Sequence, residues 1–93
     1  MKENIAEKFK AIGDMNRLKL LELIIKGESC GCTLIDKINV TQPTMHYHIN
    51  ILEAAGIVVS KKEGKWRKLD INKLSIDEMI EYLITLKKLG DNR

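Results

Sequence analysis

The spacing of the apolar residues changes twice along the chain, and this limits the folds that it can adopt. Before residue 56, apolar side chains recur every three or four positions, which is the repeat of an amphipathic helix. Residues 57–71 (IVVSKKEGKWRKLDI) instead begin with β-branched residues and contain Glu63-Gly64, which we interpret as the tight turn of a two-stranded hairpin. Helical spacing returns after Leu74. The pattern predicts a mainly α fold with a small β-hairpin.

Capping residues and glycines mark where the predicted helices begin and end. Asp14 is a typical N-cap for the second helix and Thr41 for the fourth, which has Pro43 in its first turn. Ser75 and Glu78 have the spacing of a capping box for the last helix. Four glycines follow helical runs, where a left-handed residue is favoured: Gly13, Gly27, Gly56 and Gly90. The second helix is apolar around most of its circumference, so we expect it to be central and buried: Leu18, Leu20, Leu21, Leu23, Ile24 and Ile25.

The length of 93 residues predicts one domain, residues 1–93, with a modest core. No stretch approaches the ~20 continuous apolar residues that a membrane helix needs. The N-terminal residues lack the apolar segment and cleavage site of a signal peptide. We therefore expect a cytoplasmic protein with no membrane partner, whose thiols are kept reduced.

Two short helices joined by a three-residue turn and followed by a charged hairpin predict a winged helix-turn-helix, in the order α-α-α-α-β-β-α. The second helix of the pair would lie in the major groove of DNA, with Met45, Ile49 and Leu52 facing the core. The side chains that point broadly away from this core face carry hydrogen-bonding groups, and Gln42 lies at the leading end of the helix. All of them suit contacts with base edges: Gln42, Thr44, His46, Tyr47 and Asn50. His48 borders the core face and is both a candidate DNA contact and a candidate structural histidine. The alternative is a solvated helix that happens to be polar.

The hairpin concentrates positive charge. Five cations against the single acid Glu63 give it +4, which exceeds the +3 of the whole chain: Lys61, Lys62, Lys65, Arg67 and Lys68. Such a hairpin can lie along phosphates and add salt-dependent affinity without sequence preference. A thiol-based metal carrier that never contacts DNA would have no use for these charges, so they favour a DNA-binding protein over a carrier.

The two cysteines, Cys30 and Cys32, are separated by Gly31 at the start of the third helix, predicted over residues 33–38. Residues two apart in a helix point about 200° from each other, so the pair can hold one ion only where the backbone leaves helical geometry. Gly31 makes that departure easy, and a helix N-terminus favours thiolates. The pair is therefore a candidate clamp for a soft ion, with a redox switch as the main alternative.

An enzymatic role is not expected. A thiol oxidoreductase would have Cys-x-x-Cys near a βαβ unit, and the spacing here is shorter. The two histidines lie far in sequence from either thiol, and there is no glycine-rich phosphate loop. The sequence thus predicts no catalytic residues.

Three stretches, GDMNRLKLLELI, TQPTMHYHINILEAAGIV and EGKWRKLDI, together resemble the ArsR/SmtB repressors, which release DNA on binding metal or metalloid ions. The resemblance covers about Phe9 to Ile71. It implies a homodimer formed by the first and last helices, and an operator in duplex DNA that is an imperfect palindrome with half-sites about one turn apart. The apolar stripes on those two helices supply the implied interface residues: Ile5, Phe9, Ile12, Met79, Ile80 and Leu83.

The resemblance also bears on the inducer. Cys-x-Cys at this point is similar to the arsenic- and cadmium-sensing sites of the family. Arsenic sensors often add a third cysteine three residues later, where this chain has Ile35, and cadmium and lead sensors add N-terminal cysteines that residues 1–29 lack. The resemblance implies As(III) or Sb(III) bound by Cys30 and Cys32 with a small exogenous ligand, and Cd(II) or Pb(II) as the other candidates. A thiol redox or persulfide-responsive repressor of the same fold remains an alternative.

Overall fold

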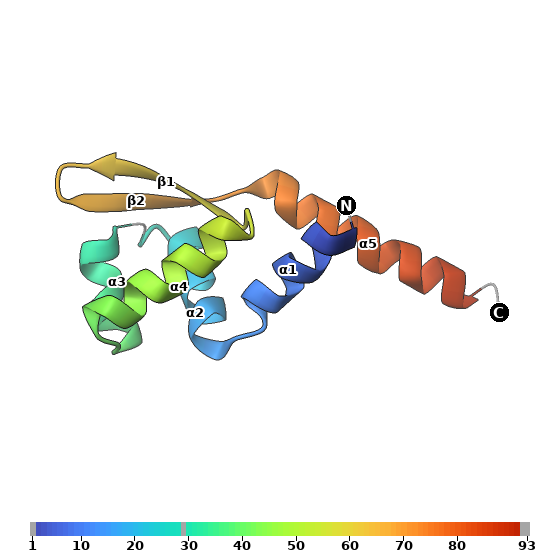
Figure 1. Cartoon of the computed structure of the whole chain (residues 1–93), viewed down its shortest axis with the longest axis horizontal. Helices are drawn as coiled ribbons and strands as arrows, with labels where there is room; N and C mark the ends of the chain where they lie inside the picture. The colour runs from blue at the N-terminus through green and yellow to red at the C-terminus, as the bar shows by residue number, and fades with distance from the viewer. Residues whose placement is uncertain (1, 29, 92–93) are drawn as a thin grey trace.

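The computed structural model describes residues 2–28 and 30–91 and gives a winged helix-turn-helix (Figure 1). The elements follow in the predicted order: α1 (Lys2–Ile12), α2 (Met15–Ile25), α3 (Gly31–Ile38), α4 (Gln42–Ala54), β1 (Val58–Glu63), β2 (Trp66–Ile71) and α5 (Lys73–Asp91). The predicted fold class, mainly α with one hairpin, is confirmed.

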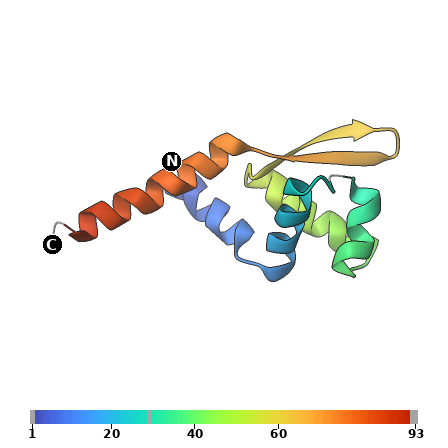
Figure 2. The ribbon, with the colours of Figure 1, turned by 180° about the vertical axis from the view of Figure 1, so that it is seen from behind.

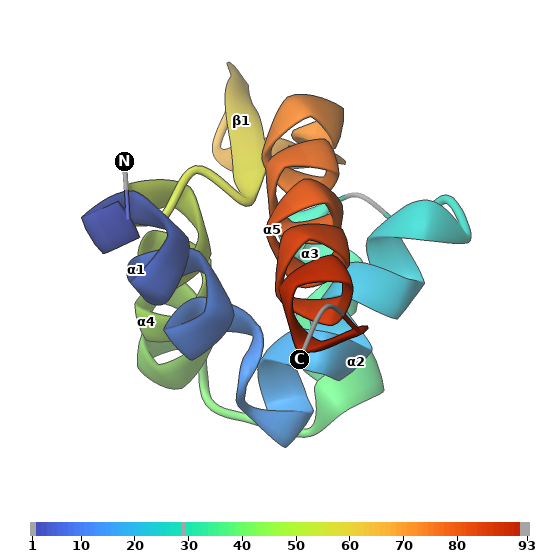
Figure 3. The ribbon, with the colours of Figure 1, turned by 90° about the vertical axis from the view of Figure 1, so that its right-hand side faces the viewer.

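The molecule is elongated, with extents of 52 × 23 × 22 Å. The hairpin covers the side of the α2–α3–α4 cluster, and α5 leads away from its base (Figure 1). The view from behind shows α2 and α3 beneath the same hairpin (Figure 2). In the view down α5, α1 and α4 lie on one side of this helix and α2 lies on the other (Figure 3). The long dimension is due to α5, because the C-terminal half of this helix extends beyond the other helices.

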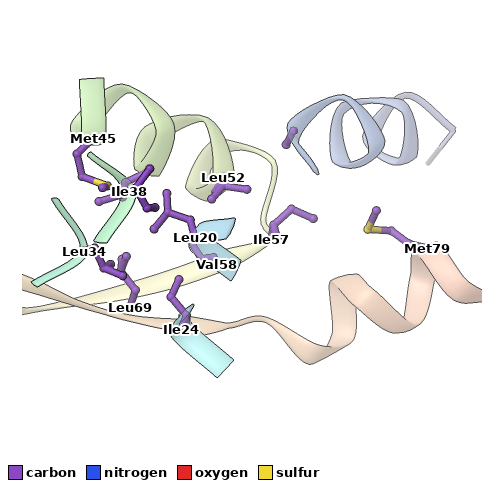
Figure 4. Packing of buried hydrophobic residues seen from close by; sticks show 12 residues of the cluster. Leu20, Ile24, Leu34, Ile38, Met45, Leu52, Ile57, Val58, Leu69 and Met79 are labelled. Carbon is purple, nitrogen blue, oxygen red and sulfur yellow. The ribbon is translucent and has the colours of Figure 1, made fainter. Parts of the chain in front are cut away.

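The core lies between α2, α3, α4 and the base of the hairpin (Figure 4). Its fully buried side chains come from all of these elements: Leu20, Leu34, Met45, Leu52 and Ile57. Each such side chain contributes about 1.5–3 kcal/mol by leaving water. Met79 lies apart from this group, between α5 and α1 (Figure 4). The helix-turn-helix and the wing thus share one core, and α5 joins it through α1.

The caps predicted for α2 and α4 are present. The backbone N–H of Arg17 donates to Asp14 Oδ2 at 3.1 Å, and the backbone N–H of Thr44 donates to Thr41 Oγ1 at 3.3 Å. Because it accepts the Arg17 N–H, Asp14 has a pKa below its ordinary value. In the turn before Thr41, Asn39 adopts a left-handed conformation with φ of 60°. Local capping chemistry therefore fixes the start of both helices.

The predicted capping box of α5 is wrong. The helix begins at Lys73, and the backbone N–H groups of Ser75 and Ile76 donate to the carbonyl of Asn72. Ser75 lies inside the first turn, buried, and its hydroxyl donates to the Gly56 carbonyl at 2.6 Å. The Ser75 hydroxyl therefore bonds to a carbonyl distant in sequence and does not cap the helix that contains it. The helix also runs through Gly90, which was expected to follow its end.

Two further expectations are corrected. The hairpin turn is Gly64-Lys65 rather than Glu63-Gly64, because Glu63 still pairs with Trp66 in the antiparallel ladder. Gly64 takes φ of 60° at the first turn position, as a type II′ turn requires. The second helix is not buried around its whole circumference. Leu20 and Ile24 of α2 are buried, whereas Ile25 is 73% exposed. Its neighbours α1, α3, α4 and β2 leave the face that carries Ile25 open.

Candidate nucleic-acid interface

The exposed side of α4 carries several polar side chains. Met45, Ile49 and Leu52 are buried as predicted and hold the helix against the core. The opposite face exposes five of the six predicted α4 contacts: Gln42, Thr44, His46, Tyr47 and Asn50. A helix held in this way presents hydrogen-bonding groups at fixed positions.

At the start of α4, the side chains of Thr41 and Thr44 form a hydrogen bond. The Thr41 hydroxyl donates to Thr44 Oγ1 at 2.9 Å while it accepts the Thr44 backbone N–H. The Thr44 hydroxyl can still donate its own proton outward, because a hydroxyl has one donor and two acceptor sites. Thr44 is therefore oriented before any ligand arrives.

A groove of about 590 Å³ separates the start of α4 from the hairpin. Gln42 and His46 line its α4 side, and Lys62 and Lys65 line its hairpin side. Ile35 of α3 contributes to its lining. The groove thus brings together hydrogen-bonding groups that suit base edges and ammonium groups that suit phosphates.

The predicted cations of the hairpin divide into two kinds. The lysines are exposed along both strands and the turn: Lys61, Lys62, Lys65 and Lys68. Arg67 is half-buried instead and is ion-paired with Glu53 of α4. It also donates to Asn50 Oδ1 at 3.2 Å, and Ser60 donates to Glu53 Oε2 at 2.9 Å. Arg67 therefore connects the wing to α4, and the four lysines carry the unmatched charge.

Glu53 and Ser60 were missed by the sequence analysis. Seven residues separate them, and 14 separate Glu53 from Arg67, so the contacts exist only after the hairpin folds back on α4. The sequence did offer one indication of the ion pair, because Glu53 is the acidic residue of α4 and a basic hairpin follows it.

His48 is removed from the set of candidate DNA contacts. It is 6% exposed and faces the interior, where the Arg17 guanidinium donates to its Nδ1 at 3.1 Å. Arginine has no acceptor, so Nδ1 must be unprotonated in this contact. Arg17 Nε also donates to the Ala11 carbonyl at 2.5 Å. His48 thus joins α4 to α1 and α2, which is the structural role.

Cys30 lies immediately before α3, which begins at Gly31, two residues earlier than predicted. The Cys30 carbonyl accepts the backbone N–H groups of Thr33 and Leu34 at 3.1 and 3.3 Å, as an N-cap residue does. Its side chain is half-buried and disulfide-bonded in this structure. The side chain of Cys32, the other predicted ligand, lies outside those that the structure describes. Cys30 therefore precedes the helix and Cys32 follows in its first turn, so the two do not share one continuous helical stretch.

Cys30 also contacts the wing. Its backbone forms an isolated antiparallel bridge with Lys68 of β2. The start of α3 is therefore attached to the strand that carries two of the predicted phosphate contacts, Arg67 and Lys68. Among the side chains that the structure describes, which do not include that of Cys32, no three or more from His, Cys, Asp or Glu gather into a group that could hold a metal ion.

The residues predicted for the dimer interface are divided between the interior and the surface. Ile5 and Met79 are buried within the chain, Phe9 and Ile12 are half-buried, and Phe9 contacts the ring of Tyr82 at 6.1 Å between centroids. The outer face of α5 remains exposed and apolar through several turns: Ile80, Leu83, Ile84, Leu86 and Leu89. We call these five residues the α5 stripe.

None of the helices in the described ranges has the length and apolarity to cross a membrane.

Comparison with known proteins agrees with this architecture. The family model described as "Bacterial regulatory protein, arsR family" matches residues 14–60. An HTH-type transcriptional regulator of Methanocaldococcus jannaschii is 42% identical over 90% of this chain and 91% of its own length. An arsenical resistance operon repressor of Bacillus subtilis is 32% identical over 91% of this chain and 84% of its own length.

Solved structures share the fold. The crystal structure of an ArsR family transcriptional regulator superposes with a TM-score of 0.88 at 23% identity, covering 100% of this chain and 96% of that one. The solution structure of a homodimeric winged helix-turn-helix DNA-binding domain from Mycobacterium bovis gives 0.73 at 18% identity, over 92% and 81%. The chain therefore belongs to the arsR family of bacterial regulatory proteins, and it is a winged helix-turn-helix transcriptional regulator and not an enzyme.

Proposed function

We propose that two copies of the chain bind a palindromic operator and repress transcription, and that a soft metalloid bound by Cys30 and Cys32 releases the DNA. The observation that carries the proposal is the groove between α4 and the hairpin, where Gln42 and His46 face Lys62 and Lys65. Its two walls match the two kinds of contact that a specific DNA complex needs, base readout and phosphate binding.

The α5 stripe supports the dimer. Exposed large apolar residues at three- and four-residue spacing along one helix of a small domain are typical of an interface. The stripe begins beside the α1–α5 contact and continues along the half of α5 that extends from the cluster (Figure 1). Two such stripes in contact would hold two copies of α4 in a symmetric arrangement, and each would meet one half-site.

Arsenite fits the dithiol as an inducer. When As(OH)₃ reacts with two thiols, two As–S bonds replace two As–O bonds, and the displaced hydroxides leave as water with the thiol protons. The third oxygen remains as an exogenous ligand. This chemistry requires reduced Cys30, so an external dithiol must first reduce the Cys30 disulfide and be oxidised to its own disulfide in exchange. Thiolates select soft ions, and antimonite shares this chemistry.

Cys30 contacts two elements through which the bound metalloid can act. Its carbonyl caps α3, and its backbone pairs with Lys68 of the wing. A metalloid that fits a distorted α3 start better than the undistorted one would shift both elements away from the DNA-bound arrangement. Coupling between two sites is commonly about 1–3 kcal/mol, which corresponds to a several-fold to hundred-fold loss of affinity.

The disulfide at Cys30 favours one second candidate, a repressor that responds to thiol oxidation. Fluorescence anisotropy of operator DNA distinguishes the two. Under reducing conditions arsenite, antimonite, cadmium, lead and zinc are added in turn, and in a parallel titration an oxidant is added without metal. Release by arsenite in excess reductant supports the metalloid inducer, and release only by the oxidant replaces it with the redox candidate.

A further inference from the structure

Lys8 is a buried lysine that the proposed DNA contacts do not use. It lies on α1 with 8% of its surface exposed, and its ammonium donates to the Ala55 carbonyl at 2.9 Å. Among the described side chains, ion pairs join Lys37 to Glu28 and Arg67 to Glu53, and none includes Lys8. Removing an ammonium group from water is costly, and the hydrogen bond to the Ala55 carbonyl offsets part of that cost.

The end of α4 receives donors from both flanking helices. The Ala55 carbonyl accepts Lys8 from α1, and the next carbonyl, that of Gly56, accepts the Ser75 hydroxyl at 2.6 Å and the Asn72 amide at 3.0 Å. The last carbonyls of a helix have no partner within it and carry the negative end of its dipole. An ammonium group beside them is therefore favourable as well as directional.

Gly56 is shaped for this convergence. Its φ is 76°, and a Cβ at this position would lie 3.2 Å from Lys8 Nζ and 3.4 Å from Ser75 Oγ. A Cβ would therefore crowd the Lys8 ammonium by a few tenths of an ångström and would stand in ordinary contact with the Ser75 hydroxyl. Gly56 therefore has two roles, the termination of α4 expected from the sequence and this close approach of Lys8 and Ser75.

We propose that Lys8 is a positioning residue that, with Asn72 and Ser75, fixes the angle between α4 and the α1–α5 pair. The inference rests on the proposed operator-binding dimer. If the α5 stripe joins two copies, the separation and tilt of the two α4 helices depend on how each is fixed to its own α1 and α5. Lys8 would then determine which half-site spacing the dimer accepts, without contacting DNA.

A buried hydrophobic residue could hold the same elements together at least as well, because replacing a buried charge by an apolar side chain is often neutral or stabilising. A directional donor does something different, since it fixes one orientation among several of similar packing. Lys8 therefore determines the orientation of α4 and not the stability of the fold, and its loss is expected to change the half-site spacing that the dimer accepts.

The test compares Lys8→Met with Lys88→Met, which removes an equal charge from an exposed position on α5. The operator is first selected by the wild-type protein from random duplex DNA. Dissociation constants are then measured for this operator, for an unrelated duplex, and for operators whose half-sites are moved apart or together by one and two base pairs. A wild-type protein that selects no sequence overturns the proposed function, and this inference with it.

For Lys8→Met we expect about a tenfold loss on the operator, no change on unrelated DNA, and a flatter dependence on half-site spacing. Lys88→Met should behave as the wild-type protein does. Equal losses on both duplexes, or an unchanged spacing preference in a folded Lys8→Met dimer, would overturn the assignment.

Ser75→Ala keeps the proposal testable if Lys8→Met does not fold, because it removes one donor to Gly56 without adding bulk. Its control is Thr85→Ala, whose hydroxyl donates within α5 to Glu81 at 2.9 Å and is exposed. Ser75→Ala should flatten the spacing dependence and Thr85→Ala should not. The same profile for both variants would reject the positioning role.

Discussion

Cys30 and Lys68 form an antiparallel bridge that attaches the start of α3 to the second strand of the wing. The residue proposed to bind the inducer is therefore bonded through its backbone to a residue proposed to contact phosphate. A change at the start of α3 reaches the hairpin directly, in addition to the route through α3 to α4.

The first prediction concerns the dithiol. Cys30→Ser and Cys32→Ser should each bind operator as the wild-type protein does but should not release it with arsenite, because a serine hydroxyl does not replace a thiolate as a ligand for a soft metalloid. Operator anisotropy under reducing conditions measures both properties. Normal release from either variant would show that the sensor lies elsewhere.

The second prediction separates base contacts from phosphate contacts. Gln42→Ala should lose about 1–3 kcal/mol on the operator and relax the preference at one base pair, because its amide is exposed at the start of α4. Lys65→Ala should weaken all sequences alike and lower the salt dependence of log K by about one unit. Binding is measured on operator and random duplexes at several salt concentrations. Equal losses on both duplexes for Gln42→Ala would argue against readout by this residue.

The third prediction uses the two histidines of α4. His48→Ala should lower the free energy of unfolding by about 1–3 kcal/mol, because it leaves Arg17 without its partner. His46→Ala should leave stability within about 0.5 kcal/mol, because His46 is exposed. Urea denaturation of the two variants at pH 7 measures the difference, and similar stabilities would show that the Arg17–His48 contact contributes nothing.

The fourth prediction follows from the N-cap of α2. The Arg17 N–H lowers the folded-state pKa of Asp14 below the unfolded value near 3.8, so the ionised cap stabilises the fold above that value and the contribution is lost as the pH falls through the lower folded-state pKa. Asp14→Ala should cost about 0.5–2 kcal/mol at pH 7.

Asp14→Asn is the matched control, because asparagine caps a helix without ionising. Thermal denaturation between pH 2 and pH 7 should show a smaller stability loss in acid for Asp14→Asn than for the wild-type protein. Identical pH profiles would exclude Asp14 as a source of the acid sensitivity.

Features that depend on short sequence separations were predictable. Asp14 and Thr41 cap their helices because each bonds an N–H three residues away, and this chemistry is visible in the sequence. Ser75 shows the limit of such reasoning. Its local pattern was equally good, but the Gly56 carbonyl, 19 residues away, competes for the same hydroxyl in the folded chain.

The candidate site was predictable to a similar degree. The exposed polar residues of α4 and the lysines of the wing follow from periodicity and charge. The roles of Arg67 and His48 do not, because their partners Glu53 and Arg17 are 14 and 31 residues away and come near only through tertiary packing. The same holds for Lys8, whose acceptor is 47 residues away.

The exposed leucines and isoleucines of α5 can make the stability of the fold depend on the concentration of the protein. If two copies pair through this stripe, each association withdraws apolar surface from water, and the stability of the fold rises with the number of molecules in the cell. At low concentration the newly made chains would be monomers of low stability that proteases degrade easily. At higher concentration most chains would be dimers, which unfold less often and resist degradation. Promoter silencing would then begin above a threshold of synthesis and not in proportion to it.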